Sequence, residues 1–317
     1  MILVCGEALI DLFVDMAGGA TARSAIPARA VPGGSPMNVA IGLSRLGVAS
    51  SFFGGLSDDG FGQRLAALLE SENVSLEAAP RLARRTTISV VVTDGRGHPA
   101  YSFYGEGGAD VSLDSGHLPA RLPEAVRAIT FGSYSMAVDP AGAAYLALAR
   151  REAGARVVSV DANFRPTVTP DCAAWRARFH DFVDCASLVK ASDEDIASGY
   201  GAEAKIDRVA ADWLARGAKL VVVTRGPNGS SAYGGAGRVD APGRPVKLVD
   251  TVGAGDTVHA ALLARLTQTG KLSREGIAGL DEAALRDLLD YANAAAAITC
   301  SREGADLPTA EEVARLI

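Results

Sequence analysis

The sequence predicts an α/β protein built around a mostly parallel sheet. Short runs of β-forming residues alternate with longer stretches of helical periodicity, the order expected for a parallel sheet with helices on both faces. The chain has 317 residues, 48% of them hydrophobic and 21% charged, which suffices for one large α/β domain or for two domains. Ligands of such sheets bind at the carboxyl ends of the strands, where the loops lie.

Local signals predict the elements in order. Residues 2–9 form an apolar run that indicates a buried strand. Ser35 as an N-cap and Pro36 in the first turn predict a helix that continues to Leu46 and is stopped by Gly47. The alternation continues with strands at 51–54, 128–132, 157–161, 187–190 and 220–224, and with helices at 59–73, 140–153, 173–179 and 207–216.

Two segments break this alternation, because they contain β-type residues but no helical pattern. In the second, the turn signal Asp94-Gly-Arg-Gly97 lies between two β-rich runs, 88–93 and 100–104, and predicts a hairpin. An extra small sheet that interrupts an α/β core suits a lid, with a dimerisation ledge as the alternative. The predicted division is a core of residues 1–11, 33–85 and 105–317, a lid of residues 12–32 and 86–104, and surface loops at 18–30 and 234–246.

Composition excludes several classes of protein. The net charge of −6 leaves no basic surplus to neutralise nucleic-acid phosphates. No apolar run approaches the roughly 20 residues of a membrane span, and no basic segment precedes the first apolar run, so we expect neither a membrane segment nor a signal peptide. The cysteines at 5, 172, 185 and 300 lack metal or redox spacing, which favours free thiols in a reducing cytoplasm.

The most informative motif is Asp250-Thr-Val-Gly-Ala-Gly-Asp256, which opens an apolar run that continues to Leu266. Its glycines allow a tight turn and the run predicts a helix, so bare N–H groups are expected at a helix N-terminus. There the unpaired donors and the helix dipole favour an anion such as phosphate. Asp256 beside that anion suits a group that accepts a proton from an attacking hydroxyl; the alternative is that it caps the helix.

A second glycine site, Gly33-Gly34-Ser-Pro-Met-Asn38, also precedes a helix. Paired glycines permit the close approach of a small polar ligand, and the Asn38 side chain offers both a donor and an acceptor. Glu7 and Asp11 lie at the end of the first predicted strand, where an aspartate can hold a sugar by accepting two hydroxyl hydrogen bonds. A plain tight turn and an exposed loop aspartate are the alternatives.

Two more predicted strands end in polar residues. Asp161-Ala-Asn163-Phe-Arg165 follows one of them, and its arginine suits a phosphate or a carboxylate, or a surface salt bridge. Thr224-Arg-Gly226 follows another and turns through Gly229, where a nucleotide contact is one interpretation and an ordinary strand connection the other. The sequence contains no P-loop, Rossmann glycine pattern, histidine metal motif or G-x-S-x-G elbow.

With both glycine motifs and the late aspartate, the chain resembles the ribokinase-like (PfkB) carbohydrate kinases over nearly its whole length. Residues 33–40 resemble the amino-terminal signature of that family, and residues 250–256 its carboxy-terminal signature. The resemblance implies a three-layer α-β-α core with a central, mostly parallel sheet and a small β-sheet lid. Within the family the chain looks like bacterial fructokinases through residues 6–11, 103–104, 109–110, 131–135, 161–166, 189–195 and 297–308.

The resemblance also implies roles for individual residues. Asp256 would deprotonate the sugar hydroxyl that attacks the γ-phosphate of ATP, and Phe103 would shield the site from water. The residues implied in catalysis are Asp256, Gly253, Ala254, Gly255 and Arg165. The N–H groups of Ala254, Gly255 and Asp256 would form the anion hole. Sugar binding falls to Asp11, Gly33, Gly34, Asn38, Phe103 and Asn163. ATP binding falls to Lys190, Asp193, Thr224, Gly226, Gly229 and Asn293, and a monovalent cation to Asp250, Val252 and Gly304.

The implied activity is that of an ATP-dependent sugar kinase in the cytoplasm. It would transfer the γ-phosphate of ATP to a primary hydroxyl, converting fructose to fructose 6-phosphate, with Mg²⁺ and, beside the anion hole, K⁺. The expected partners are the sugar and ATP, with no nucleic acid or membrane, and a second copy of the chain paired through the lid sheet.

Two alternatives and one departure from the family pattern accompany this expectation. A 2-keto-3-deoxygluconate kinase, or another sugar or nucleoside kinase, is the first alternative, and its carboxylate substrate would need a cation such as Arg84, Arg85 or Arg96. A sugar- or nucleotide-sensing protein without catalysis is the second. Lys190-Ala-Ser-Asp193 stands for the family's Asn-x-x-Glu, and because lysine cannot accept hydrogen bonds from metal-bound water, the placement of Mg²⁺ stays open.

Overall fold

The computed structural model describes residues 1–14, 26–93 and 99–317, and it confirms the predicted α/β fold class. Its main sheet has eight strands in the order β14-β13-β12-β11-β10-β9-β1-β4. From β4 to β12 the neighbours run parallel, and β13 and β14 join antiparallel at one edge. The strands are β1 (Ile2–Cys5), β4 (Ser50–Phe53), β9 (Ala128–Gly132), β10 (Val157–Asp161), β11 (Leu188–Ser192), β12 (Leu220–Thr224), β13 (Ser230–Gly234) and β14 (Gly237–Ala241).

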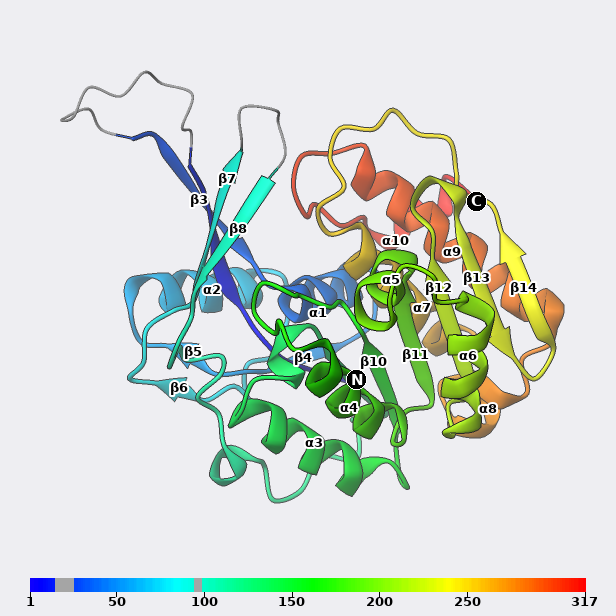
Figure 1. Cartoon of the computed structure of the whole chain (residues 1–317), viewed down its shortest axis with the longest axis horizontal. Coiled ribbons are helices and arrows are strands. Elements are labelled where there is room, and N and C mark those ends of the chain that lie inside the picture. Colours follow the sequence, from blue (N-terminus) through cyan, green and yellow to red (C-terminus); the bar gives the residue numbers. More distant parts are fainter. Residues whose placement is uncertain (15–25, 94–98) are drawn as a thin grey trace.

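Helices cover both faces of this sheet and give the three layers (Figure 1). Successive residues of a strand point to opposite faces, so Ile2 and Val4 enter one core while Leu3 and Cys5 enter the other. No helix within the described ranges is both long and apolar enough to cross a bilayer. One face carries α1 (Ser35–Arg45), α2 (Gly60–Ser71), α7 (Ala254–Gln268), α8 (Arg274–Ala278), α9 (Glu282–Cys300) and α10 (Ala310–Ala314), and the other α3 (Ala141–Glu152), α4 (Cys172–Val183), α5 (Asp193–Tyr200) and α6 (Ile206–Ala215).

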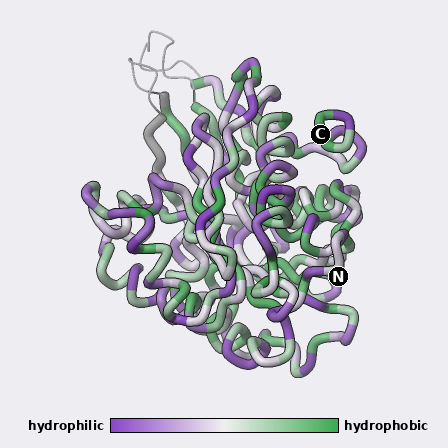
Figure 2. Tube along the Cα trace, turned by 90° about the vertical axis from the view of Figure 1, so that its right-hand side faces the viewer, coloured by the Kyte–Doolittle hydropathy of each residue, from purple (hydrophilic) through white to green (hydrophobic). Residues whose placement is uncertain are grey.

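A separate four-stranded sheet, called the lid sheet below, projects from the core. Its order is β3-β2-β7-β8, and the antiparallel pairing of β7 with β8 confirms the predicted hairpin, whose turn lies outside the described residues. Figure 2, turned by 90°, shows its strands again standing above the core. The strands are β2 (Leu9–Val14), β3 (Ala28–Gly33), β7 (Ile88–Thr93) and β8 (Pro99–Tyr104), and the pair β5 (Leu56–Ser57) and β6 (Arg81–Leu82) lies apart.

Three local predictions are wrong. The run at 2–9 is not one strand: β1 ends at Cys5, Gly6 takes φ 147°, and the chain re-enters at Leu9 in the lid sheet. Ser35 does not cap α1, because Gly34 with φ 111° occupies the N-cap and Ser35 already lies in the helix. The two stretches predicted as surface loops are not all loop: β13 and β14 pair as a hairpin within 234–246, and β3 includes the last three residues of 18–30, whose residues 18–25 lie outside the described ranges.

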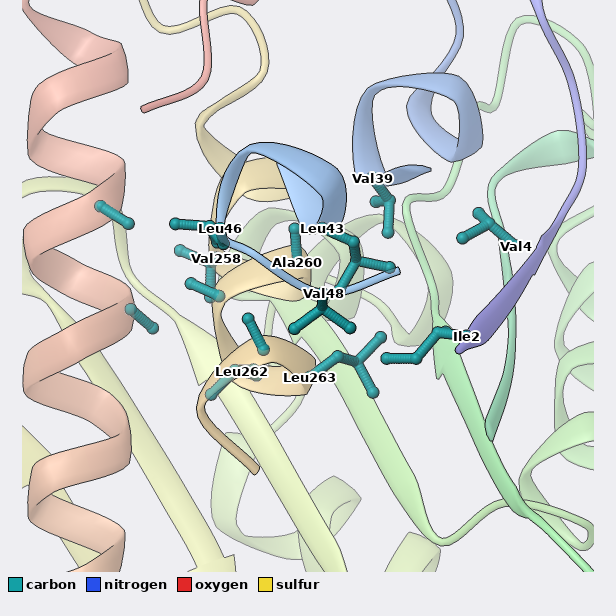
Figure 3. Close-up of a cluster of buried hydrophobic side chains, with 14 of the residues drawn as sticks. Ile2, Val4, Val39, Leu43, Leu46, Val48, Val258, Ala260, Leu262 and Leu263 are labelled. Atoms are coloured by element: carbon teal, nitrogen blue, oxygen red, sulfur yellow. The ribbon is translucent and has the colours of Figure 1, made fainter. Parts of the chain in front are cut away.

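Close packing between α1 and α7 positions the functional residues (Figure 3). Apolar side chains of both helices, among them Leu43 and Leu263, meet β1 at Ile2. Gly42 permits the close approach, because a methyl group at that position would lie 2.9 Å from Cβ of Ala260. The first turns of the two helices therefore come together at the carboxyl end of the sheet.

Candidate active site

Asp256 lies in the first turn of α7 with its carboxylate turned toward α1. Its Oδ1 accepts a hydrogen bond from Oγ of Ser35 at 2.7 Å, and its Oδ2 accepts one from Nδ2 of Asn38 at 2.8 Å. Gly253 occupies the N-cap of α7 with φ 78°, and no described side chain caps that helix. The capping alternative for Asp256 is therefore wrong. The carboxylate is only 8% exposed and is oriented by another helix.

The start of α7 presents backbone donors beside this carboxylate. The N–H of Ala254 donates back to the carbonyl of Thr251 over 3.2 Å. The next two, those of Gly255 and Asp256, have no backbone acceptor in the part of the chain that the structure describes. Two free donors thus coincide with the positive end of the helix dipole, the combination that binds an anion.

Asp11 and Gly33 lie diagonally across the paired strands β2 and β3, because Gly33 is opposite Leu9 and Asp11 is opposite Val31. A methyl group on Gly33 would stand 2.2 Å from Oδ2 of Asp11, so only glycine leaves that carboxylate its place. Burial raises the pKa of Asp11, the charge of Arg165 opposes the rise, and the charge of Asp256 adds to it. Asp11, Arg165 and Asp256 therefore lie within electrostatic reach of one another, although they come from three separate elements.

The loop after β10 brings Arg165 to this edge of the sheet. Asn163 in that loop is buried and takes φ 33°, a conformation held by its neighbour, because the N–H of Phe164 donates to Oδ1 of Asp195 over 2.8 Å. Arg165 is exposed and forms no ion pair with any residue in the described ranges. Its guanidinium group is available to a ligand anion.

Sequence reasoning missed Asp195, which joins the Arg165 loop to α5. Oδ2 of Asp195 accepts the N–H of Ser192, whose Oγ in turn accepts the N–H of Asp195. This capping box has a readable signal, a serine followed three residues later by an acid. Ser192 and Asp195 also have the three-residue spacing of the family's Asn-x-x-Glu, two positions further along the chain than Lys190 and Asp193. Asp193, half-buried, begins α5 and accepts the N–H of Glu194.

Phe103 anchors the lid sheet to the core. Its ring packs edge-to-face on Tyr134 with the ring centres 5.6 Å apart, beside Leu9 and Val111. Tyr134 donates to Asp110, which also accepts a hydrogen bond from Thr87 at 2.5 Å. Of the arginines considered for a carboxylate substrate, two are exposed just before β7 and the third lies outside the described residues; they are Arg84, Arg85 and Arg96.

Three of the residues predicted to bind ATP lie at the carboxyl end of β12, in the loop that leads into the antiparallel strand β13. Thr224 ends β12, and Gly226 and Gly229 follow it with φ 52° and 84°. Asn293 of α9 supports this loop from behind, because it accepts from Ser230 Oγ at 2.9 Å and donates to the carbonyl of Pro242 at 3.1 Å. Its polar atoms are thus already used in bracing the loop.

Asp250 joins the two backbone segments predicted to hold a monovalent cation. Its Oδ1 accepts the N–H of Val252 at 3.1 Å, and its Oδ2 that of Gly304 at 2.8 Å. Arg29 of the lid sheet forms an ion pair with Glu303, the neighbour of Gly304, at 2.8 Å. Within the described residues no three His, Cys, Asp or Glu side chains cluster as metal ligands.

Lys190 lies behind the α7 loop and is almost inaccessible to solvent. Its Nζ donates to Oδ2 of Asp161 over 2.9 Å, and the two side chains are 4% and 2% exposed. Burial alone would lower the pKa of Lys190, but the charges of Asp161, Asp195 and Asp256 and the hydrogen bond to Asp161 together raise it, so the ammonium stays charged. His259 next to them is neutral, since burial lowers its pKa to about 3.

Known proteins resemble this chain in both sequence and fold. Residues 1–312 match the model of the pfkB family carbohydrate kinases. A fructokinase of Rhizobium leguminosarum bv. trifolii is 40% identical over 90% of this chain and 86% of its own length. The crystal structure of fructokinase with bound ATP from Xylella fastidiosa superposes with a TM-score of 0.88 at 27% identity, covering 100% of this chain and 97% of that one. A fructokinase double mutant of Vibrio cholerae O395 in fructose, ADP and potassium ion bound form has a TM-score of 0.83 at 25% identity, covering 99% and 97%.

Proposed function

Since the chain belongs to the pfkB family of carbohydrate kinases, we propose that it transfers the γ-phosphate of ATP to the primary hydroxyl of fructose, giving fructose 6-phosphate and ADP. The named relatives above are fructokinases, and one neighbouring structure holds fructose with ADP. The observation that carries the proposal is the fixed carboxylate of Asp256 beside the free N–H groups at the start of α7.

Asp256 is the general base of the proposed reaction. It accepts the proton of the sugar hydroxyl as the bond between that oxygen and the γ-phosphorus forms. The bond from the γ-phosphorus to the bridging oxygen breaks, and its electron pair leaves with ADP. Ser35 and Asn38 hold the carboxylate in place, so little reorganisation is needed when the hydroxyl arrives.

The negative charge of the transferring phosphoryl group meets the start of α7. After the turn at Gly253 and Ala254 the N–H groups of Gly255 and Asp256 are free, and the exposed Arg165 supplies a positive charge from the loop after β10. Such donors stabilise charge that develops during the transfer and contribute more there than they do in the ground state.

The sugar side of the proposed site lies between the lid sheet and α1. Asp11 and Asn38 offer oxygen and nitrogen atoms to the sugar hydroxyls, and the lack of a side chain at Gly33 and Gly34 lets Asp11 and the backbone of Glu7 approach closely there. Asn163 and Phe103 are the remaining proposed contacts of the sugar. The lid segments, 12–32 and 86–104, are proposed to cover the sugar and exclude water.

The nucleotide side lies over β11 and β12. The proposed contacts are Thr224, Gly226, Gly229 and Asp193, with Asn293 behind them. Lys190 is on the phosphate side but is buried against Asp161, behind the α7 loop. Mg²⁺ bound to the ATP phosphates would neutralise their charge. The backbone carbonyls near Val252 and Gly304, drawn together by Asp250, would hold K⁺.

We also propose that the protein is a homodimer and is located in the cytoplasm. Two copies would pair through the lid sheet, whose edge strands β3 and β8 leave backbone groups free and expose Tyr104. Use of ATP and the absence of paired cysteine spacing are consistent with a cytoplasmic location.

ADP release across a panel of sugars tests the proposed function. The panel holds fructose, mannose, glucose, ribose, a nucleoside and 2-keto-3-deoxygluconate, each with ATP, Mg²⁺ and K⁺. The proposal expects the highest kcat/KM with fructose. Sugar-dependent release that favours 2-keto-3-deoxygluconate would move the assignment to that kinase. No release with any sugar, despite measurable ligand binding, would support the sensing alternative.

A further inference from the structure

The Lys190–Asp161 pair occupies a specific place in the sheet. Asp161 ends β10, and in the parallel register its Cα partner on β11 is Lys190. Their side chains meet at the carboxyl edge, where the ammonium and the carboxylate are both more than nine-tenths buried. Strand register therefore fixes the positive charge at one point of the molecule.

That point lies against the anion site. A methyl group built on Gly255 would stand 3.0 Å from Nζ of Lys190, so the ammonium touches the loop whose N–H groups remain free. Gly255 is also the residue before Asp256. The negative charge of Asp256 contributes to the raised pKa of Lys190, which places the two groups within electrostatic reach.

The ionisable groups around Lys190 are few. Asp161 faces it from β10, Asp195 from α5, and Asp256 and the neutral His259 from α7. Oδ1 of Asp161 and Nδ1 of His259 have no hydrogen-bond partner among the described residues. Both residues line a cavity of about 10 Å³, enough for one water molecule, which Ser35 also lines. Lys190 is the positive charge of this buried cluster.

A structural role does not require this pair. A buried ion pair usually adds little net stability compared with two apolar side chains of similar volume, because both charges must be taken out of water. The neighbouring positions of these strands, Val160 and Val189, are filled by such apolar residues. A charge at this place calls for another explanation, and the adjacent anion site supplies one.

We propose that Lys190, held by Asp161, is a fixed positive charge behind the anion site that stabilises both the ionised Asp256 and the phosphoryl group during its transfer. It acts through the α7 loop without touching ATP or sugar, so it is a positioning residue for the charge of the site. The inference rests on the proposed kinase function and adds to it a component from beneath the loop.

A variant cycle isolates the ammonium charge. Asp161→Asn is compared with Asp161→Asn/Lys190→Met, which differ only in that charge and leave no buried carboxylate unpaired. The double variant should lower kcat roughly 100-fold relative to Asp161→Asn, with the KM values for ATP and fructose within about twofold. The acid limb of its pH–kcat profile should move up by about one pH unit, because a lost positive charge raises the pKa of a nearby carboxyl group.

A matched pair at the other end of β10 is the control. Glu152 and Arg156 form a mostly buried ion pair just before the strand begins. Glu152→Gln and Glu152→Gln/Arg156→Met should have the same kcat and acid limb as each other. That result separates the charge beside α7 from the general cost of altering a buried pair.

The outcomes distinguish a role of Lys190 behind the anion site from a role in nucleotide binding and from failure of the kinase proposal itself. Equal kcat and equal acid limbs for the two Asp161 variants would overturn the inference, and so would a change confined to KM for ATP, which would place Lys190 in nucleotide binding. If the double variant does not fold, Asp161→Asn alone decides: an untethered ammonium should lower kcat about tenfold, and a wild-type kcat would reject the role. Wild-type protein that releases no ADP with any sugar would instead reject the proposed function itself.

Discussion

Nδ2 of Asn38 donates to Oδ2 of Asp256 across 2.8 Å, joining the first turns of two helices that are 218 residues apart in the chain. Oγ of Ser35 donates to the other oxygen at 2.7 Å. Both donors belong to the helix that follows the paired glycines, so the two glycine motifs meet at one carboxylate. These contacts bring the two motifs together at one place in the fold.

Ser35→Ala should lower kcat roughly tenfold while KM for fructose changes little. The hydroxyl contacts the carboxylate and orients it, and a hydrogen bond to a charged group has about that effect when it is removed. Steady-state kinetics measure the change. Ser44→Ala, in the last turn of the same helix, is the control and should keep wild-type kinetics. A Ser35→Ala protein with unchanged kcat would show that Asn38 alone orients the base.

Asn38→Asp should reduce activity at neutral pH roughly 100-fold. The new carboxyl group would stand within hydrogen-bond distance of Asp256, and two such groups share one proton instead of both ionising. The acid limb of the pH–rate profile should therefore move to higher pH. Asn73→Asp, exposed after α2, serves as the control. A profile that coincides with that of the wild type would contradict the arrangement described.

Gly33→Ala should raise KM for fructose about tenfold or more. The added methyl group would lie 2.2 Å from Oδ2 of Asp11 and would push that carboxylate out of place. Gly60→Ala places the same methyl group in open space at the start of α2 and should leave KM unchanged. Unchanged KM in Gly33→Ala would remove Asp11 from the sugar site.

Glu7→Gln should stabilise the protein above neutral pH. Glu7 is 1% exposed, and burial raises its pKa from 4.5 to about 7. The folded state therefore holds a proton that the unfolded state has released, and stability falls as pH rises from 4.5 through 7, by about 3 kcal/mol. Glutamine carries no charge, so urea unfolding of the variant should lack this loss.

The comparison for Glu7 is made at pH 5 and pH 8. The difference in unfolding free energy between Glu7→Gln and the wild type should be small at pH 5 and close to its full value at pH 8. Glu77→Gln, which is exposed, should follow the wild type at both values. An equal difference at the two pH values would mean that Glu7 titrates as an ordinary carboxyl group.

The strands that sequence predicted best are the central ones. Residues 128–132, 157–161 and 220–224 are predicted with their observed bounds, because each is a short buried run between turn signals. The strands β13 and β14 contain few β-branched residues and gave no such signal, since their pairing is set by the hairpin turn and the edge of the sheet. The break after Cys5 depends on which sheet each half joins, which local periodicity does not specify.

In the candidate site, too, some features could be predicted from local sequence and others depend on the tertiary structure. The motifs identified Asp256, Asn38 and Asp11 by residue type and spacing. They did not reveal that Ser35 and Asn38 bond to Asp256, or that Lys190 pairs with Asp161, because those contacts depend on helix packing and strand register. Asp195 was within reach of sequence reasoning, since the Ser-x-x-Asp spacing of its capping box is local.

The measurement that tests the central claim most directly is fructose-dependent ADP release by Asp256→Asn. The variant keeps the shape of the side chain and loses the base, so kcat should fall roughly 1,000-fold while the dissociation constants for fructose and ADP stay within about threefold of wild type. Wild-type kcat in the Asp256→Asn protein would contradict the claim that this carboxylate takes the proton of the attacking hydroxyl.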